Sequence, residues 1–122
     1  MNSLYPGNLP FAIDIERLSL LNNNKEAILW NGELLKITLM SINPGESIGV
    51  SESTNGNVFY KIVDGIGLFE SGSSNTNLNF KRIVCKNAAM SVPADDFNNL
   101  TNVGNRTLKL YSITTLAPST PM

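Results

Sequence analysis

The residues that could take part in acid-base or nucleophilic chemistry are few, because the chain contains no histidine. Histidine is the side chain that most often transfers protons at neutral pH, so a carboxylate would have to replace it. The adjacent Asp95 and Asp96 point to opposite sides of an extended backbone and would not form a carboxylate pair. Ser51 and Ser53 have no visible base partner to activate a serine nucleophile. The sequence therefore predicts no catalytic residue.

Composition limits the class of protein. The chain has 122 residues, and its nine basic and ten acidic residues are spread along it without a basic run. This predicts a single domain that binds neither nucleic acid nor an anionic membrane surface. The first residues lack the basic and apolar segments of a signal peptide, and no apolar run is long enough to span a membrane. We therefore expect a cytoplasmic protein.

Short apolar segments separated by turn residues predict an all-β fold. Two Asn-Gly dipeptides, at 31–32 and 55–56, suit the tight turn of a β-hairpin, because both central turn positions need positive φ. They predict two hairpins, made of residues 26–30 with 33–42 and 47–53 with 57–63. Residues 71–77 form a polar loop, expected at the mouth of the fold. Further strands are expected at 67–70, 79–85, 88–92 and 107–113. Residues 13–21 could form a strand or a short helical turn, of which we expect the strand. Many short strands without an amphipathic helix indicate a sandwich or barrel.

The spacing of residues between positions 45 and 65 resembles the first sequence motif of the cupin superfamily. That motif is usually a glycine, five residues, HxH, three or four residues, a glutamate, six residues and a glycine. The corresponding residues here are Gly45, Ser51, Ser53, Val58 and Gly65. The spacing is complete, although the chemistry of the motif has changed.

The second cupin motif is matched less closely. It usually reads as a glycine, five residues, PxG, two residues, a histidine, three residues and an asparagine, and only the proline and the last asparagine are kept. The corresponding residues are Asn87, Pro93, Asp95, Asn98 and Asn102. The resemblance to single-domain bacterial cupins covers residues 13–115. It implies a jelly-roll β-barrel, or double-stranded β-helix. Pro6, Gly7 and Pro10 predict an extended N-terminal arm at 1–12, and the proline-rich residues 116–122 predict a C-terminal tail.

The resemblance also implies what the chain lacks. The three histidines and the glutamate that bind metal in cupins correspond to Ser51, Ser53, Asn98 and Val58. Neutral hydroxyl and amide groups bind divalent transition metals weakly, and valine has no ligand atom. We therefore expect no metal site and no cofactor, and the metal-dependent activities of the family are not predicted for this chain.

The same correspondence indicates a ligand-binding site. If Val58 points into the barrel as the family's glutamate does, Tyr60 shares its face, Ser51 and Ser53 point inward from the paired strand, and Asn98 points inward from a later one. These five residues are the predicted ligand contacts, around a mildly polar and uncharged cavity. Such a cavity suits a small polar ligand such as a sugar, a nucleotide-like or an aromatic compound. A packed interior filled by these side chains is the alternative.

Three functional hypotheses follow. The first is a non-enzymatic, metal-free cupin that binds a small polar molecule as a sensor or a sequestering protein. The second is a metal-independent enzyme of the isomerase or lyase type that uses Tyr60, Asp95 or Asp96. The third is a structural or partner-binding module with a filled barrel. In each case we expect a homodimer, because cupins commonly pair through open sheet edges and exchange terminal arms, here residues 1–12.

Overall fold

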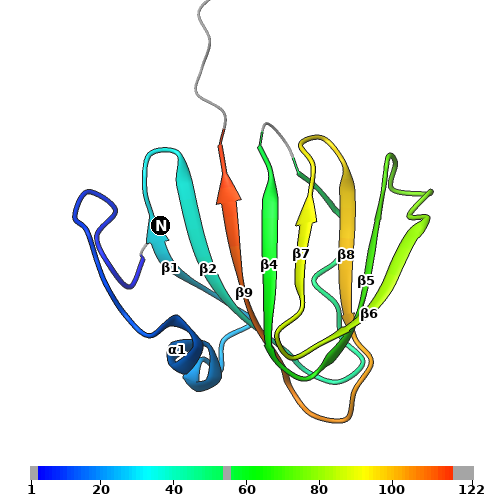
Figure 1. Cartoon of the computed structure of the whole chain (residues 1–122), viewed down its shortest axis with the longest axis horizontal. Helices are drawn as coiled ribbons and strands as arrows, with labels where there is room; N and C mark the ends of the chain where they lie inside the picture. The colour runs from blue at the N-terminus through cyan, green and yellow to red at the C-terminus, as the bar shows by residue number, and fades with distance from the viewer. Residues whose placement is uncertain (1–2, 54–55, 117–122) are drawn as a thin grey trace, which may run out of the picture.

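The protein folds into nine strands and one short helix (Figure 1). The computed structural model describes residues 3–53 and 56–116. The strands are β1 (Glu26–Asn31), β2 (Leu35–Ile42), β3 (Ser51–Glu52), β4 (Val58–Asp64), β5 (Ile66–Gly72), β6 (Phe80–Cys85), β7 (Ala89–Val92), β8 (Phe97–Asn102) and β9 (Leu108–Thr115), and the helix is α1 (Ile15–Leu21). The predicted all-β class is confirmed.

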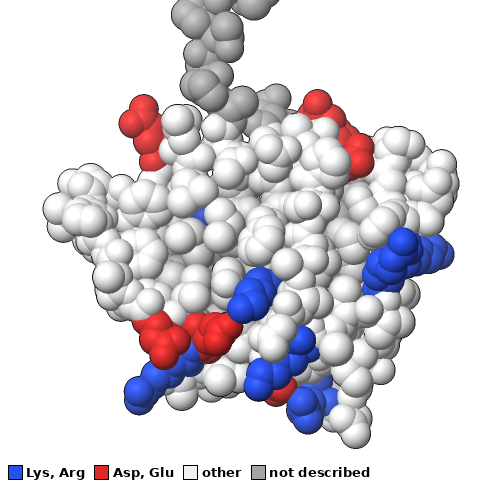
Figure 2. Space-filling model, viewed as in Figure 1, with Lys and Arg blue, Asp and Glu red and all other residues white. Residues whose placement is uncertain are grey.

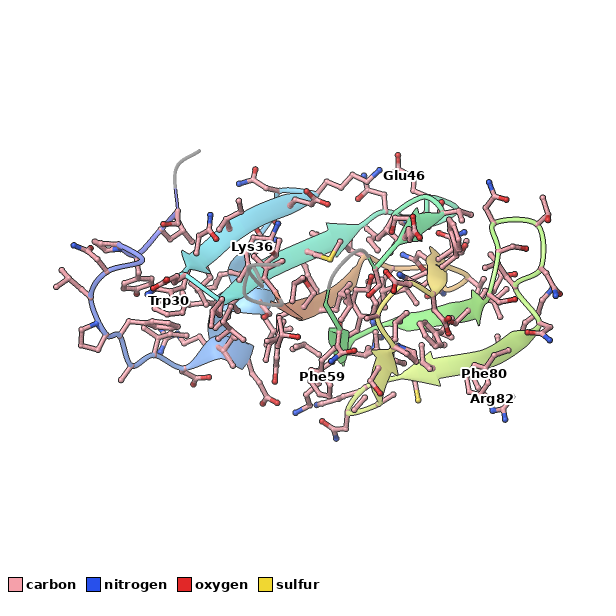
Figure 3. All side chains as sticks on the ribbon, turned by 90° about the horizontal axis from the view of Figure 1, so that it is seen from above. Trp30, Lys36, Glu46, Phe59, Phe80 and Arg82 are labelled. Atoms are coloured by element: carbon pink, nitrogen blue, oxygen red, sulfur yellow. The ribbon has the colours of Figure 1, made fainter. Side chains whose placement is uncertain are left out.

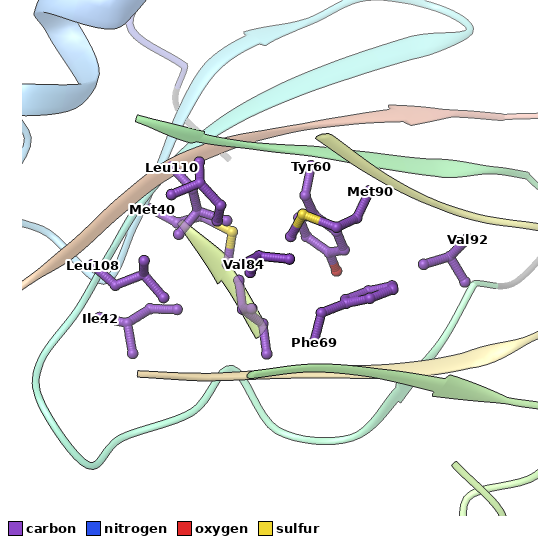
Figure 4. Packing of buried hydrophobic residues seen from close by; sticks show 11 residues of the cluster. Met40, Ile42, Tyr60, Phe69, Val84, Met90, Val92, Leu108 and Leu110 are labelled. Atoms are coloured by element: carbon purple, nitrogen blue, oxygen red, sulfur yellow. The ribbon is translucent and has the colours of Figure 1, made fainter. Parts of the chain in front are cut away.

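Two antiparallel sheets face each other and enclose the core. The larger sheet has the strand order β1-β2-β9-β4-β7, and the smaller has the order β3-β8-β5-β6. Strand β9 therefore lies between β2 and β4, although it is the last strand of the chain. Side chains from both sheets meet in one hydrophobic cluster (Figure 4). Its buried members are Met40, Ile42, Tyr60, Ile62, Phe69, Val84, Met90, Val92, Leu100, Leu108 and Leu110.

The four positions that the resemblance aligned with glycines all have a left-handed backbone. Gly45 and Gly65 have φ of 82° and 101°, and Asn87 and Asp95 have φ of 75° and 71°. Asparagine and aspartate enter this conformation more readily than other residues with a side chain. The two sequence motifs therefore keep their turn geometry even where glycine has been replaced.

The prediction of a strand at 13–21 is wrong, because residues 15–21 form helix α1. Asp14 caps its N-terminus, and the Asp14 carboxylate accepts a hydrogen bond of 3.1 Å from the backbone N–H of Arg17. Glu16 binds Lys61 of β4 at 2.7 Å, and Lys109 of β9 donates to the carbonyl of Asn22 at the helix end. These contacts hold α1 against the larger sheet. No helix in the described part of the chain is long and apolar enough to cross a membrane.

Replacing Asp14 by alanine is expected to lower the free energy of unfolding by about 1 kcal/mol, because the N–H of Arg17 loses its capping acceptor. Chemical denaturation measures this change. Asp14→Asn is the matched control, since an asparagine oxygen can still cap the helix, and it should retain most of the stability. Equal destabilisation by both substitutions would contradict the capping role.

The first predicted hairpin is confirmed as an antiparallel pair of β1 and β2, but its two-residue turn is wrong, and the second predicted hairpin is wrong altogether. Residues 32–34 separate β1 from β2, with the N–H of Gly32 bound to the carbonyl of Leu35, and neither Asn31 nor Gly32 has positive φ. The second pair of segments does not pair at all, because β3 binds β8 in one sheet and β4 binds β7 and β9 in the other. Asn55 of the predicted second turn lies outside the described residues.

The N-terminal segment lies along β1, at the edge of the larger sheet. Tyr5 pairs with Trp30 in a parallel bridge, and the Trp30 indole N–H points at the carbonyls of Pro6 and Leu9 at 3.1 and 3.0 Å (Figure 3). The Phe11 ring lies 5.3 Å from the Tyr5 ring and 5.8 Å from that of Trp30. The segment thus covers a sheet edge of its own chain, and its exchange between subunits stays a prediction.

Candidate functional site

A cavity of about 430 Å³ lies between the two sheets. All five side chains predicted as ligand contacts line it. They come from β3 and the residue that follows it, from β4 and from β8, whereas the prediction placed the first four on one hairpin. They are Ser51, Ser53, Val58, Tyr60 and Asn98. At this end of the fold the interior is therefore open rather than filled.

Tyr60 and Asn98 form a fixed polar pair in the cavity wall. The Tyr60 hydroxyl donates a hydrogen bond of 2.7 Å to Oδ1 of Asn98, and the Asn98 amide donates to the carbonyl of Ser51 at 3.4 Å. The Tyr60 ring also packs edge-on against Phe69 of the opposite sheet, with 6.4 Å between ring centroids. Burial, together with the Glu26 carboxylate, raises the pKa of Tyr60 to about 12. Tyr60 is therefore a neutral hydrogen-bond donor at physiological pH and not a base.

The two predicted serines differ in what they offer a ligand. Ser53 is buried, and its hydroxyl donates a hydrogen bond of 2.8 Å to the carbonyl of Gly56. Its backbone also binds Asp95 and Asp96, so Ser53 fixes the chain where β3 ends. Ser51 lies opposite Asn98 in the register of β3 and β8, and its side chain is exposed. Ser53 thus has a structural hydrogen bond, whereas Ser51 is accessible.

A row of hydroxyl groups on the larger sheet was missed by the sequence analysis. Thr38 of β2 pairs with Ser112 of β9, and Ser112 pairs with Tyr60 of β4, so the three side chains cross the sheet in line. Thr38 and Ser112 line the cavity and are each 7% exposed. Within the described residues neither hydroxyl makes a hydrogen bond. Only the register of β2 with β9 places these hydroxyls in the cavity wall, and a single sequence does not reveal that register.

The prediction of an uncharged cavity is wrong. Glu26 of β1 and Lys36 of β2 line it, and register places both on the interior face, since Glu26 pairs with the buried Met40 and Lys36 pairs with Thr114. Glu52 also borders the cavity, but it pairs with Phe97 and so stands on the opposite face of β3 from Ser51. The interior face therefore carries one positive and one negative side chain.

A second cavity, of about 390 Å³, lies between β5, β6 and β7. Phe69 and Phe80 line it, with their rings 6.1 Å apart, and Asp96 lies on its wall. The polar loop expected at the mouth of the ligand cavity contributes Ser73 to this second cavity instead. Asp95 and Asp96 do not line the first cavity, so they do not approach Tyr60 as a catalytic set.

The donor set at the aligned metal positions does not fit a divalent transition metal. Val58 has no ligand atom, the oxygen of Asn98 accepts from Tyr60, and Ser53 is bound to a backbone carbonyl. Among residues 3–53 and 56–116, no three His, Cys, Asp or Glu side chains lie close enough to hold a metal ion. The cavity is therefore a site of hydroxyl, amide and isolated charged groups.

Two facing antiparallel sheets around an internal cavity, with the left-handed turns of both motifs in place, correspond to the fold of the cupins. No family model matches the chain. The crystal structure of BH2720 from Bacillus halodurans superposes with a TM-score of 0.87 at 38% identity, covering 94% of this chain and 86% of that one. A cupin superfamily protein from Desulfitobacterium hafniense superposes with a TM-score of 0.68 at 22% identity, covering 89% and 95%. These neighbours show that the chain has the double-stranded β-helix fold of the cupins.

A relative in Bacillus subtilis (strain 168), the uncharacterized protein YrkC, is 41% identical over 107 residues. The match covers 88% of this chain and 58% of that protein, so the chain spans less than two thirds of its relative's length.

Proposed function

We propose that this cupin is a non-enzymatic, metal-free protein that binds a small polar molecule in the cavity between its sheets, as a sensor or a sequestering protein. The observation that carries the proposal is the pair of hydroxyls of Thr38 and Ser112, two residues that are otherwise buried, which face a cavity of about 430 Å³ without a protein hydrogen-bond partner among the described residues. These hydroxyls are accessible from the cavity, so a ligand or water that enters it can bind them.

The open cavity supports binding over a structural module with a filled barrel. The placement of the acidic residues supports binding over catalysis, because Asp95 and Asp96 lie away from Tyr60. A Tyr60 phenol with a pKa of about 12 holds its proton at neutral pH and cannot accept one. Among the residues first assigned to it, the isomerase or lyase alternative therefore has no proton acceptor that lines this cavity.

A thermal-shift screen of the purified protein against sugars, nucleotides and small aromatic compounds tests this function, since a ligand that binds the folded state raises the melting temperature. Thr38→Val and Ser112→Ala should each weaken binding of a compound found in this way by about 5-fold, because each removes one hydrogen bond. Isothermal calorimetry measures the change.

The matched control is Ser41→Ala. Ser41 belongs to the same strand as Thr38 and is equally buried, but it does not line the cavity, so its loss should leave the affinity unchanged. A screen without any stabilising compound, or equal binding by Thr38→Val, Ser112→Ala and the unaltered protein, would contradict the proposal. Stoichiometric iron, manganese, nickel or zinc that survives dialysis would contradict its metal-free part.

The homodimer and the cytoplasmic location stay proposals. Strand β6 ends the smaller sheet and exposes Phe80 and Ile83, so an unpaired strand edge is accessible to a second copy. On the face seen in Figure 2, Lys and Arg side chains are interspersed with Asp and Glu along the lower edge and do not form a continuous basic surface. This supports the expectation of no nucleic-acid partner.

A further inference from the structure

Glu26 and Lys36 place opposite charges at the two ends of one wall of the cavity. Lys36 stands on β2 (Figure 3). Glu26 stands on β1 opposite Met40, which is four positions further along β2 than Lys36. At the rise of an extended strand this separates the two backbone positions by ~13 Å. Thr38 lies midway between them on the same interior face, beside Ser112. The wall thus presents a cation, a hydroxyl pair and an anion in that order.

Neither charge is neutralised by a neighbour. The described part of the chain contains three ion pairs, Lys61 with Glu16, Lys81 with Glu70 and Arg106 with Asp64, and none of them includes Glu26 or Lys36. No side-chain hydrogen bond among the described residues uses either group. Like most charged side chains of the described residues, Glu26 and Lys36 are outside these ion pairs, and because they also line the cavity they are available to a ligand.

The field of Glu26 also extends into the cavity. Its carboxylate is one of the two causes that raise the pKa of Tyr60, which is itself part of the wall. Part of the same wall is apolar, because Ile28, opposite Thr38, and Met40, opposite Glu26, also line the cavity. A ligand that lies along this wall would meet polar, apolar and charged groups within one extended path.

We propose that the ligand is a small linear zwitterion, with its carboxylate at Lys36, its ammonium at Glu26 and its chain crossing the hydroxyls of Thr38 and Ser112. This inference rests on the proposed binding function and names the chemical class of its ligand. A monoanion would leave the Glu26 carboxylate unpaired at the other end, and a monocation would leave the Lys36 ammonium unpaired. A zwitterion satisfies both charges at once and forms charge-assisted hydrogen bonds at each end.

A matched set of six-carbon compounds tests the charge requirement. Binding of 6-aminohexanoate, hexanoate, hexylamine and hexane-1,6-diol is measured by calorimetry. We expect 6-aminohexanoate to bind about 10-fold or more tightly than each of the other three, because each loses at least one charge-assisted contact. Within a series from glycine to 8-aminooctanoate, affinity should be highest at an intermediate length that spans the two charged groups.

Charge reversal provides the sharper test, since a linear ω-amino acid can bind in either direction. Lys36→Glu alone and Glu26→Lys alone should each weaken 6-aminohexanoate binding by about 10-fold or more, because two like charges then face the ligand. The double variant Lys36→Glu with Glu26→Lys should restore most of the affinity. Glu26 is exposed and Lys36 is half-buried, and circular dichroism and the melting temperature confirm that each variant is folded.

The outcomes separate this inference from the proposed function. If 6-aminohexanoate and its homologues fail to bind, or if the double reversal binds no better than the single variants, the zwitterion is excluded. If a neutral sugar or the diol binds in a manner that depends on Thr38 and Ser112 but not on Lys36 or Glu26, the binding function holds and only the ligand class is wrong.

Discussion

Replacing Asn102 by alanine is expected to lower the free energy of unfolding by about 3 kcal/mol or more. Asn102 is 1% exposed, and its amide donates to the carbonyls of Ile42 and Arg106 at 2.8 and 2.9 Å. Its side-chain oxygen accepts from the N–H of Gly104 at 2.9 Å. Alanine removes all three bonds, and each buried group left without a partner costs about 1–3 kcal/mol. Denaturant titration measures the loss.

Asn99 provides a control on the same strand. Among the described residues its buried side-chain oxygen has no hydrogen-bond partner. Asn99→Ala therefore removes an unsatisfied acceptor rather than a network, and it should change the free energy of unfolding by about 0.5 kcal/mol or less, or stabilise the protein slightly. Equal destabilisation by Asn99→Ala and Asn102→Ala would show that Asn102 does not hold the ends of β2 and β8 together.

Motif spacing predicted the cupin fold because the fold depends on turns that few residues can make. Gly45 and Gly65 lie at left-handed positions, and Gly65 also has no room for a side chain, since an added Cβ would lie 3.0 Å from the Cα of Leu108. Asn87 and Asp95 keep the left-handed turns of the second motif without glycine. Backbone geometry of this kind requires glycine, asparagine or aspartate at fixed spacing in the sequence, even when the metal ligands between the turns have changed.

Local patterns failed where tertiary context decides the structure. The segment that became β8, FNNLTN, is too polar to predict a strand, yet its alternate residues Asn98, Leu100 and Asn102 are buried. The amides of Asn98 and Asn102 are acceptable in the core because both are hydrogen-bonded there. The opposite error occurred at α1, where a short apolar segment suited a strand or a helix, and the Asp14 cap together with packing against the sheet selected the helix.

The sequence predicted the lining residues of only one wall of the cavity. Ser51, Val58, Tyr60 and Asn98 were found because the motif marks their positions, whereas the residues of the opposite wall belong to no motif. Thr38, Ser112 and the two charged groups reach the cavity because β9, last in the sequence, inserts between β2 and β4. This pairing joins segments about seventy residues apart, and one sequence carries no local signal of it.

The stability of the protein should fall as the pH rises from about 10 to about 12, because Tyr60 holds its proton more firmly in the folded state. Burial and the Glu26 carboxylate raise the pKa of Tyr60 from the ordinary 10.0 to about 12. Between these values the unfolded chain loses the phenolic proton first, so the unfolded state binds fewer protons and becomes favoured. Below pH 10 the stabilisation is fully present, and above pH 12 about 3 kcal/mol of it is lost.

Tyr60→Phe isolates this contribution from that of the lysines, which titrate in the same pH range. At neutral pH the variant should be less stable by about 1–3 kcal/mol, because the buried oxygen of Asn98 loses the Tyr60 hydroxyl. Between pH 10 and 12 its free energy of unfolding should fall less steeply than that of the unaltered protein, so the two curves converge. If the free energies of unfolding of the two proteins fell equally with pH, Tyr60 would ionise equally well in the folded and unfolded states. Its phenol would then be accessible to water despite the hydrogen bond to Asn98.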